Sequence, residues 1–95
     1  MTPLERDIER KLVGAVKQHG GLCLKWVCPG WGGVPDRIVL LPGGRVVFVE
    51  TKRPKGGKLE ELQKWWAKTL RGLGFRVWHI WTFEDLEQFR QVVLT

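Results

Sequence analysis

The segment from Gly33 to Lys52, GVPDRIVLLPGGRVVFVETK, constrains the fold of this chain more than any other. It contains two runs rich in β-branched and aliphatic residues, DRIVLL and RVVFVE, on either side of a Pro-Gly-Gly turn signal. Such a pattern favours an antiparallel hairpin. Asp36 starts the first run and Glu50 ends the second, so the sequence predicts that the hairpin brings these two carboxylates to one end of a sheet.

The remaining segments alternate between helical and strand patterns. A helix is expected between Pro3 and the Gly20-Gly21 pair, with a capping box formed by Thr2 and Glu5. The next expected elements are strands at 22–27, 36–41 and 45–50, a helix at about 59–73, a strand at 75–81 and a final helix capped by Thr82 and Asp85. The predicted order is α-β-β-β-α-β-α.

The strand-helix-strand unit near the end of the chain predicts a right-handed crossover that places its two strands parallel. Together with the antiparallel hairpin, this gives a small mixed sheet with helices packed on it, an α/β fold. In the helix at about 59–73, one face is expected to be apolar and to pack on the sheet. Its members are Leu59, Leu62, Trp66, Leu70 and Leu73.

Length and charge restrict the classes of protein that remain. The 95 residues suit one domain, expected over 1–95, and the 16 Lys and Arg against 10 Asp and Glu give a net charge of +6. A basic surplus favours a polyanionic partner such as nucleic acid, although a basic domain without such a partner is an alternative. Cys23 and Cys28 cannot form a four-cysteine zinc site, and we expect reduced thiols in a cytoplasmic protein with no membrane span.

The ends of the predicted hairpin carry the residue types that a metal-assisted hydrolysis needs. Glu50 and Lys52 are two residues apart and project from the same face of a strand. Two carboxylates can hold Mg²⁺ or Mn²⁺, and the bound metal lowers the pKa of a water molecule. A neighbouring lysine can stabilise the negative charge that develops in the reaction. The alternative is that these are solvated strand-end charges that form a cross-strand pair worth about 0.5 kcal/mol.

This arrangement resembles a known nuclease signature. The dipeptide PD at 35–36, followed by ETK at 50–52, is similar to the PD-(D/E)xK motif. With GVPDR, the LPGGRVVFVE hairpin and QKWW at 63–66, the chain resembles the VRR-NUC branch, in particular the stand-alone phage-type domains. The resemblance implies a restriction-endonuclease-like αβββαβ core, here followed by a C-terminal helix, and a metal-dependent DNA endonuclease.

The resemblance also implies roles for individual residues. Asp36 and Glu50 would bind Mg²⁺ or Mn²⁺ together with the main-chain carbonyl of Thr51, whose side chain is expected to point away from the metal. Lys52 would be the catalytic lysine. Gln63 would be an additional helical residue of the active site, although it could instead be an amide satisfied at the edge of the apolar stripe.

The family also carries a glutamate on its first helix. Glu5, followed by Ile8 and Leu12, fits this position, and Glu9, followed by Leu12 and Val16, fits equally. We expect Glu5 to be the catalytic acid because the glutamate of stand-alone members lies near the start of the chain.

Several basic and aromatic residues are candidates for DNA contacts. Arg53, Lys55 and Lys58 follow Lys52 in a loop that would grip phosphates in a salt-dependent manner, or would simply be solvated. Arg37 either holds a phosphate or pairs with an acid. Trp31 in PGWGG either stacks on distorted DNA, packs in a dimer interface or covers the hydrophobic core.

These inferences predict a metal-dependent endonuclease. The resemblance implies a homodimer that acts on branched DNA such as four-way junctions and cruciforms. One alternative is a non-catalytic nucleic-acid-binding module with the same fold. The other is a nuclease subunit that needs a larger helicase or phage partner.

Overall fold

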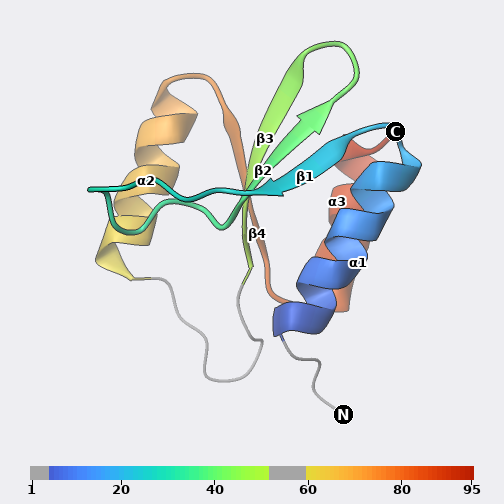
Figure 1. Ribbon diagram of the computed structural model, residues 1–95, viewed down its shortest axis with the longest axis horizontal. Coiled ribbons are helices and arrows are strands. Elements are labelled where there is room, and N and C mark those ends of the chain that lie inside the picture. The colour runs from blue at the N-terminus through green and yellow to red at the C-terminus, as the bar shows by residue number, and fades with distance from the viewer. Residues whose placement is uncertain (1–4, 52–59) are drawn as a thin grey trace.

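The computed structural model describes residues 5–51 and 60–95 and confirms the predicted order of elements (Figure 1). These elements are α1 (Glu5–Gln18), β1 (Leu22–Lys25), β2 (Arg37–Leu41), β3 (Arg45–Thr51), α2 (Glu61–Gly72), β4 (Arg76–Ile80) and α3 (Phe83–Val93). The four strands form one sheet in the order β1-β2-β3-β4. Helices α1 and α3 lie side by side against one face, and α2 lies on the opposite side of the sheet (Figure 1). Among the described residues, no helix is long and apolar enough to cross a membrane.

The strand pairings are those that the sequence predicts. Strands β2 and β3 form an antiparallel hairpin in which Arg37 lies opposite Val49. Gly43 and Gly44 in its turn have φ values of 82° and 74°, which favour glycine. Strand β4 pairs parallel to β3 after the α2 crossover, so the sheet is mixed.

Alternation along β3 divides the hydrophobic core into two clusters. Val47 and Val49 point toward α1 and α3, where they join Ile8, Leu12, Val16, Phe89 and Val93. Phe48 points toward α2, where it joins Ala67, Leu70 and Val77. Because β3 has neighbours on both sides and helices on both faces, its last residues are held more firmly than those of an edge strand.

The helix caps and the apolar stripes agree with the prediction only in part. The expected cap of α3 is confirmed, because Thr82 Oγ1 accepts a hydrogen bond of 3.0 Å from the Asp85 amide. The apolar stripe of α2 was predicted correctly only in part. Leu70 is buried and Trp66 packs against the core, but Leu62 and Leu73 are 56% and 70% exposed. Ala67, which was not in the predicted stripe, is also buried, and the predicted Leu59 and the Thr2 cap lie outside the described residues.

Phe89 should contribute strongly to stability because it is fully buried and its ring meets Trp78 edge-on at 5.5 Å. We expect Phe89→Ala to lower the free energy of unfolding by about 3–5 kcal/mol. The matched control is Val92→Ala on the exposed side of the same helix, which should change it by less than about 0.5 kcal/mol. Urea denaturation followed by tryptophan fluorescence measures both, and similar losses in the two variants would contradict the described packing of α3.

Candidate active site

The open end of the β2–β3 hairpin fixes Asp36 beside the end of β3. One step beyond the Arg37–Val49 pair, the register places Asp36 opposite Glu50. The Asp36 Oδ2 atom accepts hydrogen bonds from the Thr51 amide and the Thr51 hydroxyl, both at 3.0 Å. The Asp36 carbonyl also accepts a bond of 2.8 Å from the Trp26 amide. The side chain of Asp36 is therefore held by Thr51 and its main chain by Trp26. The expected convergence of Asp36 with the end of β3 is present.

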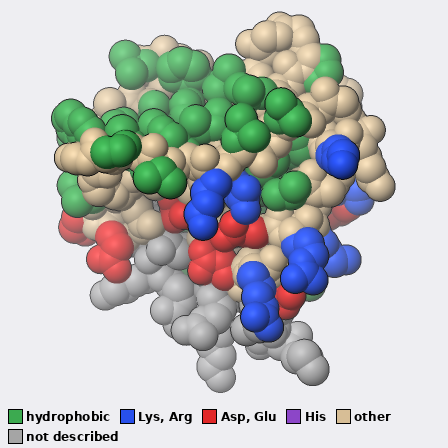
Figure 2. Space-filling model, viewed as in Figure 1, with side chains coloured by type: hydrophobic (Ala, Val, Ile, Leu, Met, Phe, Trp, Pro, Cys, Tyr) green, Lys and Arg blue, Asp and Glu red, His purple; other side chains and the backbone are tan. Residues whose placement is uncertain are grey.

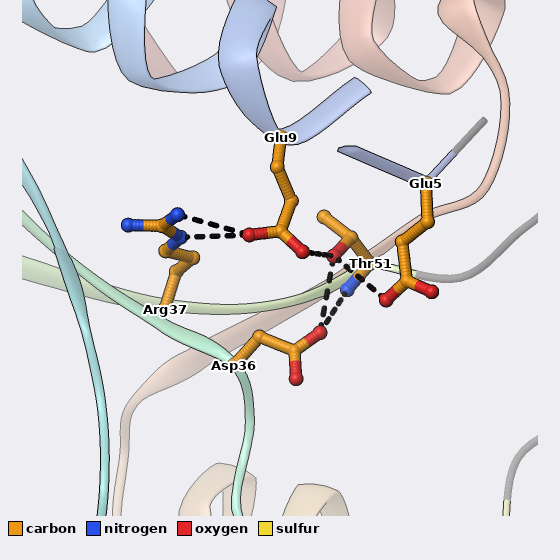
Figure 3. Close-up of polar contacts among 5 residues, drawn as sticks. All are labelled: Glu5, Glu9, Asp36, Arg37 and Thr51. Atoms are coloured by element: carbon orange, nitrogen blue, oxygen red, sulfur yellow. Dashed lines mark hydrogen bonds and ion pairs between the residues drawn. The ribbon is translucent and has the colours of Figure 1, made fainter. Parts of the chain in front are cut away.

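Helix α1 brings two more carboxylates to this point (Figure 3). Glu5 and Glu9 are one turn apart, and their Oε1 atoms lie 3.4 and 3.2 Å from Thr51 Oγ1. One carboxylate oxygen from each of Glu5, Glu9 and Asp36 lies within 4.8 Å of the others. The structure thus brings both candidate helical acids to the site, and we call Glu5, Glu9, Asp36 and Thr51 the acidic cluster.

Arg37 pairs with an acid, which is one of the two roles expected for it. Its Nε and Nη2 atoms donate to Glu9 Oε2 at 3.2 and 2.9 Å, and both side chains are mostly buried. A guanidinium held by two bonds to one carboxylate is well oriented. Both oxygens of Glu9 therefore have protein partners, Arg37 on one and Thr51 on the other (Figure 3). A phosphate contact by Arg37 stays a prediction.

Thr51 was expected to point away from the metal, yet its hydroxyl contacts the carboxylate of Asp36, which is one of the predicted ligands. Thr51 is completely buried and its hydroxyl faces Asp36 and α1. The physical reason is that Asp36 lies just before β2 begins, so its side chain reaches past the hairpin plane to the α1 side of β3. The sequence contained one signal of this contact, namely a threonine where the resembled family often has an apolar residue.

Glu50 lies on the opposite face of β3 and is joined to α2. Its side chain is only 2% exposed, and Glu50 Oε1 accepts a bond of 2.9 Å from Gln63 Nε2. The Gln63 Oε1 atom in turn accepts the Glu60 amide at 2.9 Å, which fixes the orientation of the side-chain amide. Gln63 therefore lies beside Glu50, and this bond offsets part of the cost of burying a carboxylate, whereas its role in an active site stays a prediction.

His79 is the register neighbour of Glu50 on β4. Burial, and to a smaller extent the positive charge of Arg71, lowers the pKa of His79 below its usual value. The lowered pKa favours the neutral imidazole, which suits a half-buried histidine on a strand.

The loop that leads into Asp36 is packed tightly on α2. Trp66 Nε1 donates a bond of 2.9 Å to the Gly32 carbonyl. Gly33 has a φ of 79°, and a Cβ atom there would lie 2.5 Å from Leu62 Cβ. Only glycine fits this approach, which joins the segment before Asp36 to the helix that carries Gln63.

Trp31 belongs to an aromatic group on the α2 side. Its ring meets Trp66 edge-on at 5.7 Å, yet it remains 59% exposed. The contact agrees with a residue that covers the core, and the stacking and dimer roles remain predictions. The other predicted site residues, Lys52, Arg53, Lys55 and Lys58, lie outside the described part of the chain.

The acidic cluster fits a hard divalent cation. Its donors are the carboxylate oxygens of Glu5 and Glu9 on α1 and of Asp36 just before β2. The buried Glu50 precedes Thr51 directly on β3. Oxygen-only donor sets suit Mg²⁺ and Mn²⁺, whereas soft metals prefer thiolate ligands. The geometry therefore supports a metal-binding site of the expected chemical type at this end of the hairpin.

The sheet, its three flanking helices and the acidic cluster define the class of this protein, a compact α/β domain of the restriction-endonuclease-like fold. A solved structure of a VRR_NUC domain matches this chain with a TM-score of 0.88 and 26% sequence identity, and the match covers 94% of this chain and 96% of the other. The chain is therefore similar in fold to a VRR_NUC domain, and this likeness, together with a phage relative, supports a phage-type VRR-NUC domain.

A curated relative adds sequence similarity to this structural likeness. It is named "Putative nuclease p44", from Acyrthosiphon pisum secondary endosymbiont phage 1, and is 52% identical over 50 residues. The match covers 53% of this chain and about half, 54%, of that protein. A comparison with models of known protein families found no match.

The close approach at Gly33 can be separated from its backbone conformation. We expect Gly30→Ala to cost about 1–2 kcal/mol, because Gly30 has a φ of 85° but no atom within 4 Å of its added Cβ. Gly33→Ala should cost at least about 1 kcal/mol more, because the added atom overlaps Leu62. Chemical denaturation measures the difference, and equal losses would show that the loop does not pack on α2 as described.

Proposed function

We propose that this chain is a divalent-metal-dependent DNA endonuclease that hydrolyses phosphodiester bonds. The observation that carries the proposal is the convergence of Glu5, Glu9 and Asp36 on Thr51, directly beside the buried Glu50. This arrangement occurs in a fold shared with a VRR_NUC domain. The name of the phage relative, which describes a nuclease, supports the same activity.

The proposed ligands of Mg²⁺ or Mn²⁺ are the Asp36 and Glu50 carboxylates and the main-chain carbonyl of Thr51. When bound, the metal supplies a water molecule of lowered pKa and positive charge beside the scissile phosphate. Gln63 orients Glu50 through its bond of 2.9 Å. Lys52, which follows Thr51 directly, is proposed to place its ammonium group where negative charge develops.

The contacts of the two α1 acids support different roles for them. Glu9 has one oxygen held by Arg37 and the other in contact with Thr51. Glu5 approaches Thr51 with one oxygen at the longer distance of 3.4 Å. We propose Glu5, the acid that the resemblance favours, as the one that acts at the metal or its bound water, and Glu9 as the acid that is paired with Arg37.

DNA contacts are proposed for the basic residues that follow Lys52. Arg53, Lys55 and Lys58 would bind phosphates next to the cleaved bond, and such binding weakens steeply with salt. Arg37 is also retained as a candidate, although its guanidinium is bonded to Glu9 and would contact DNA only with its remaining donors. For a DNA substrate, the proposed location of the activity is the cytoplasm of a bacterial or phage-infected cell.

Branched DNA and a homodimer are finer parts of the proposal, and the resemblance to phage-type domains suggests both. A dimer with two-fold symmetry presents two sites to a four-way junction that also has two-fold symmetry, and can nick both strands. The chain has an apolar surface available for such an interface. Leu22, Leu24 and Leu40 are exposed on the α2 side of β1 and β2, and we call them the open sheet patch. Figure 2 shows apolar side chains gathered over the part of the molecule that carries β1 and α2.

Two other functions would use the same fold. A non-catalytic DNA-binding module would bind in a salt-dependent manner without cutting, and a partner-dependent subunit would cut only when a larger helicase or phage protein is added. The acidic cluster supports catalysis over the first, because its three carboxylates oppose the binding of DNA phosphates unless a cation is also held.

Cleavage should depend on the carboxylates at the open end of the hairpin. We expect Asp36→Asn, Glu50→Gln and Lys52→Ala each to reduce the rate of Mg²⁺- or Mn²⁺-dependent cutting by roughly 100-fold or more, because each removes charge from the reaction centre. The substrate is a supercoiled plasmid that extrudes a cruciform, with EDTA as the metal control. The matched control is Glu87→Gln on the exposed side of α3, which should cut like the wild type.

Each result of this assay has a distinct meaning. Linear product that maps to the cruciform, made by the wild type and the control variant alone, supports a structure-selective nuclease. Unchanged cutting by Glu50→Gln would contradict the assigned site. No cutting by the wild type, with tight and salt-sensitive binding, would move the function to a binding module or a partner-dependent subunit.

The oligomeric state tests the homodimer separately. We expect light scattering at micromolar concentration to give twice the 11.0 kDa mass of the chain. Leu24→Glu should give the monomer mass, because it places a charge in the open sheet patch. Val92→Glu, at an exposed apolar position on α3, should remain a dimer. A monomer mass for the wild type would overturn this part of the proposal.

A further inference from the structure

The side chain of Thr51 contacts three carboxylates at the site. Thr51 is the last residue of β3, between the buried Glu50 and the predicted catalytic Lys52. The resemblance gives it a role only through its main-chain carbonyl. Its side chain, however, is completely buried on the side of β3 that faces α1.

The Thr51 hydroxyl is the atom around which the acidic cluster is arranged. The Oγ1 atom lies 3.0 Å from Asp36 Oδ2, 3.2 Å from Glu9 Oε1 and 3.4 Å from Glu5 Oε1 (Figure 3). These carboxylates come from two segments that are 27 or more residues apart in sequence.

A hydroxyl at this position does what an apolar side chain of the same size cannot do. The hydroxyl carries one proton, so it donates to one carboxylate at a time. All three carboxylates lie 3.0–3.4 Å from its oxygen, so each is within reach of that proton. Valine would fill the same volume and suit a strand, but it would remove the hydroxyl donor that faces these carboxylates, while Arg37 would still bond Glu9 and the main-chain amide would still bond Asp36. Mutual repulsion would then drive Glu5 and Glu9 on α1 away from Asp36.

We propose that Thr51 is a positioning residue, whose hydroxyl holds Asp36 and the α1 carboxylates in the single arrangement that a divalent cation requires. The proposal rests on the metal-dependent function proposed above and assigns a role in it to the side chain of Thr51. Thr51 acts through the carboxylates and touches neither substrate nor the reacting phosphate. Residues that orient metal ligands typically change metal affinity by about 10–100-fold when they are removed.

A purely structural role makes a different prediction. Thr51 also links β3 to α1, so its loss could lower stability without any effect on metal binding by the folded protein. The two roles separate when metal affinity and stability are measured on the same variants. Metal binding is measured with Mn²⁺ and no DNA, so the result does not depend on cleavage.

The experiment titrates Mn²⁺ into the full chain by isothermal calorimetry, beside urea denaturation in EDTA. We expect Thr51→Val to bind Mn²⁺ about 10-fold or more weakly than the wild type. Thr51→Ser, which keeps the hydroxyl, should stay within about 3-fold. The matched control is Thr69→Val on α2, on the other side of the sheet, which should bind like the wild type. If Thr51→Val does not fold, Thr51→Ala against Thr51→Ser gives the same comparison, since both lack the methyl group.

The outcomes distinguish this inference from the proposed nuclease. Wild-type Mn²⁺ affinity in folded Thr51→Val or Thr51→Ala, with reduced stability only, would overturn the positioning role and leave the nuclease intact. Weakened binding that serine restores, in a wild type that never cuts DNA, would support the positioning role and overturn the nuclease. A wild type that binds no Mn²⁺ would overturn both.

Discussion

The carboxylate of Asp36, bonded to the amide and the hydroxyl of Thr51, is the contact on which the site depends. It closes the open end of the β2–β3 hairpin one step beyond the last paired residues. The register of the hairpin therefore decides which residues meet there. A slip of one residue would turn Glu50 and Thr51 to the wrong faces of the sheet, and the acidic cluster would separate.

The end of β3 collects functional groups from both helical layers because successive side chains point to opposite faces. Glu50 points toward α2 and bonds Gln63, whereas Thr51 points toward α1 and contacts Glu5 and Glu9. Strand β3 lies between β2 and β4, and its last two residues, Glu50 and Thr51, are paired with β4. The tight packing of Gly33 on α2 also constrains the site, because it fixes the segment that leads to Asp36.

Local signals were sufficient to predict most of the fold. The Pro-Gly-Gly turn predicted the β2–β3 hairpin, and the spacing of Thr82 and Asp85 predicted the cap of α3, as the structure confirms. Helical periodicity gave only part of the buried side of α2, because it cannot tell which part of an apolar stripe meets the sheet. Leu70 is buried, whereas Leu62 and Leu73 match the helical spacing but are exposed.

Long-range contacts of the site were harder to predict from the sequence. The hairpin placed Asp36 near Glu50, but the one signal at Thr51, a polar residue where the resembled family often has an apolar one, did not show that its hydroxyl reaches α1. The choice between Glu5 and Glu9 also stayed open, because residues one turn apart share a face of the helix. In the structure, Arg37, 28 residues away from Glu9 in sequence, pairs with Glu9, and this long-range contact is one difference between the two acids.

The central claim is that a divalent cation binds at the open end of the hairpin. The most direct measurement is anomalous X-ray diffraction from crystals of this chain grown with Mn²⁺. The account predicts an anomalous peak in contact with the carboxylates of Asp36 and Glu50 and with the main-chain carbonyl of Thr51. A peak bound elsewhere, or none at this position when the carboxylates are ordered, would contradict it.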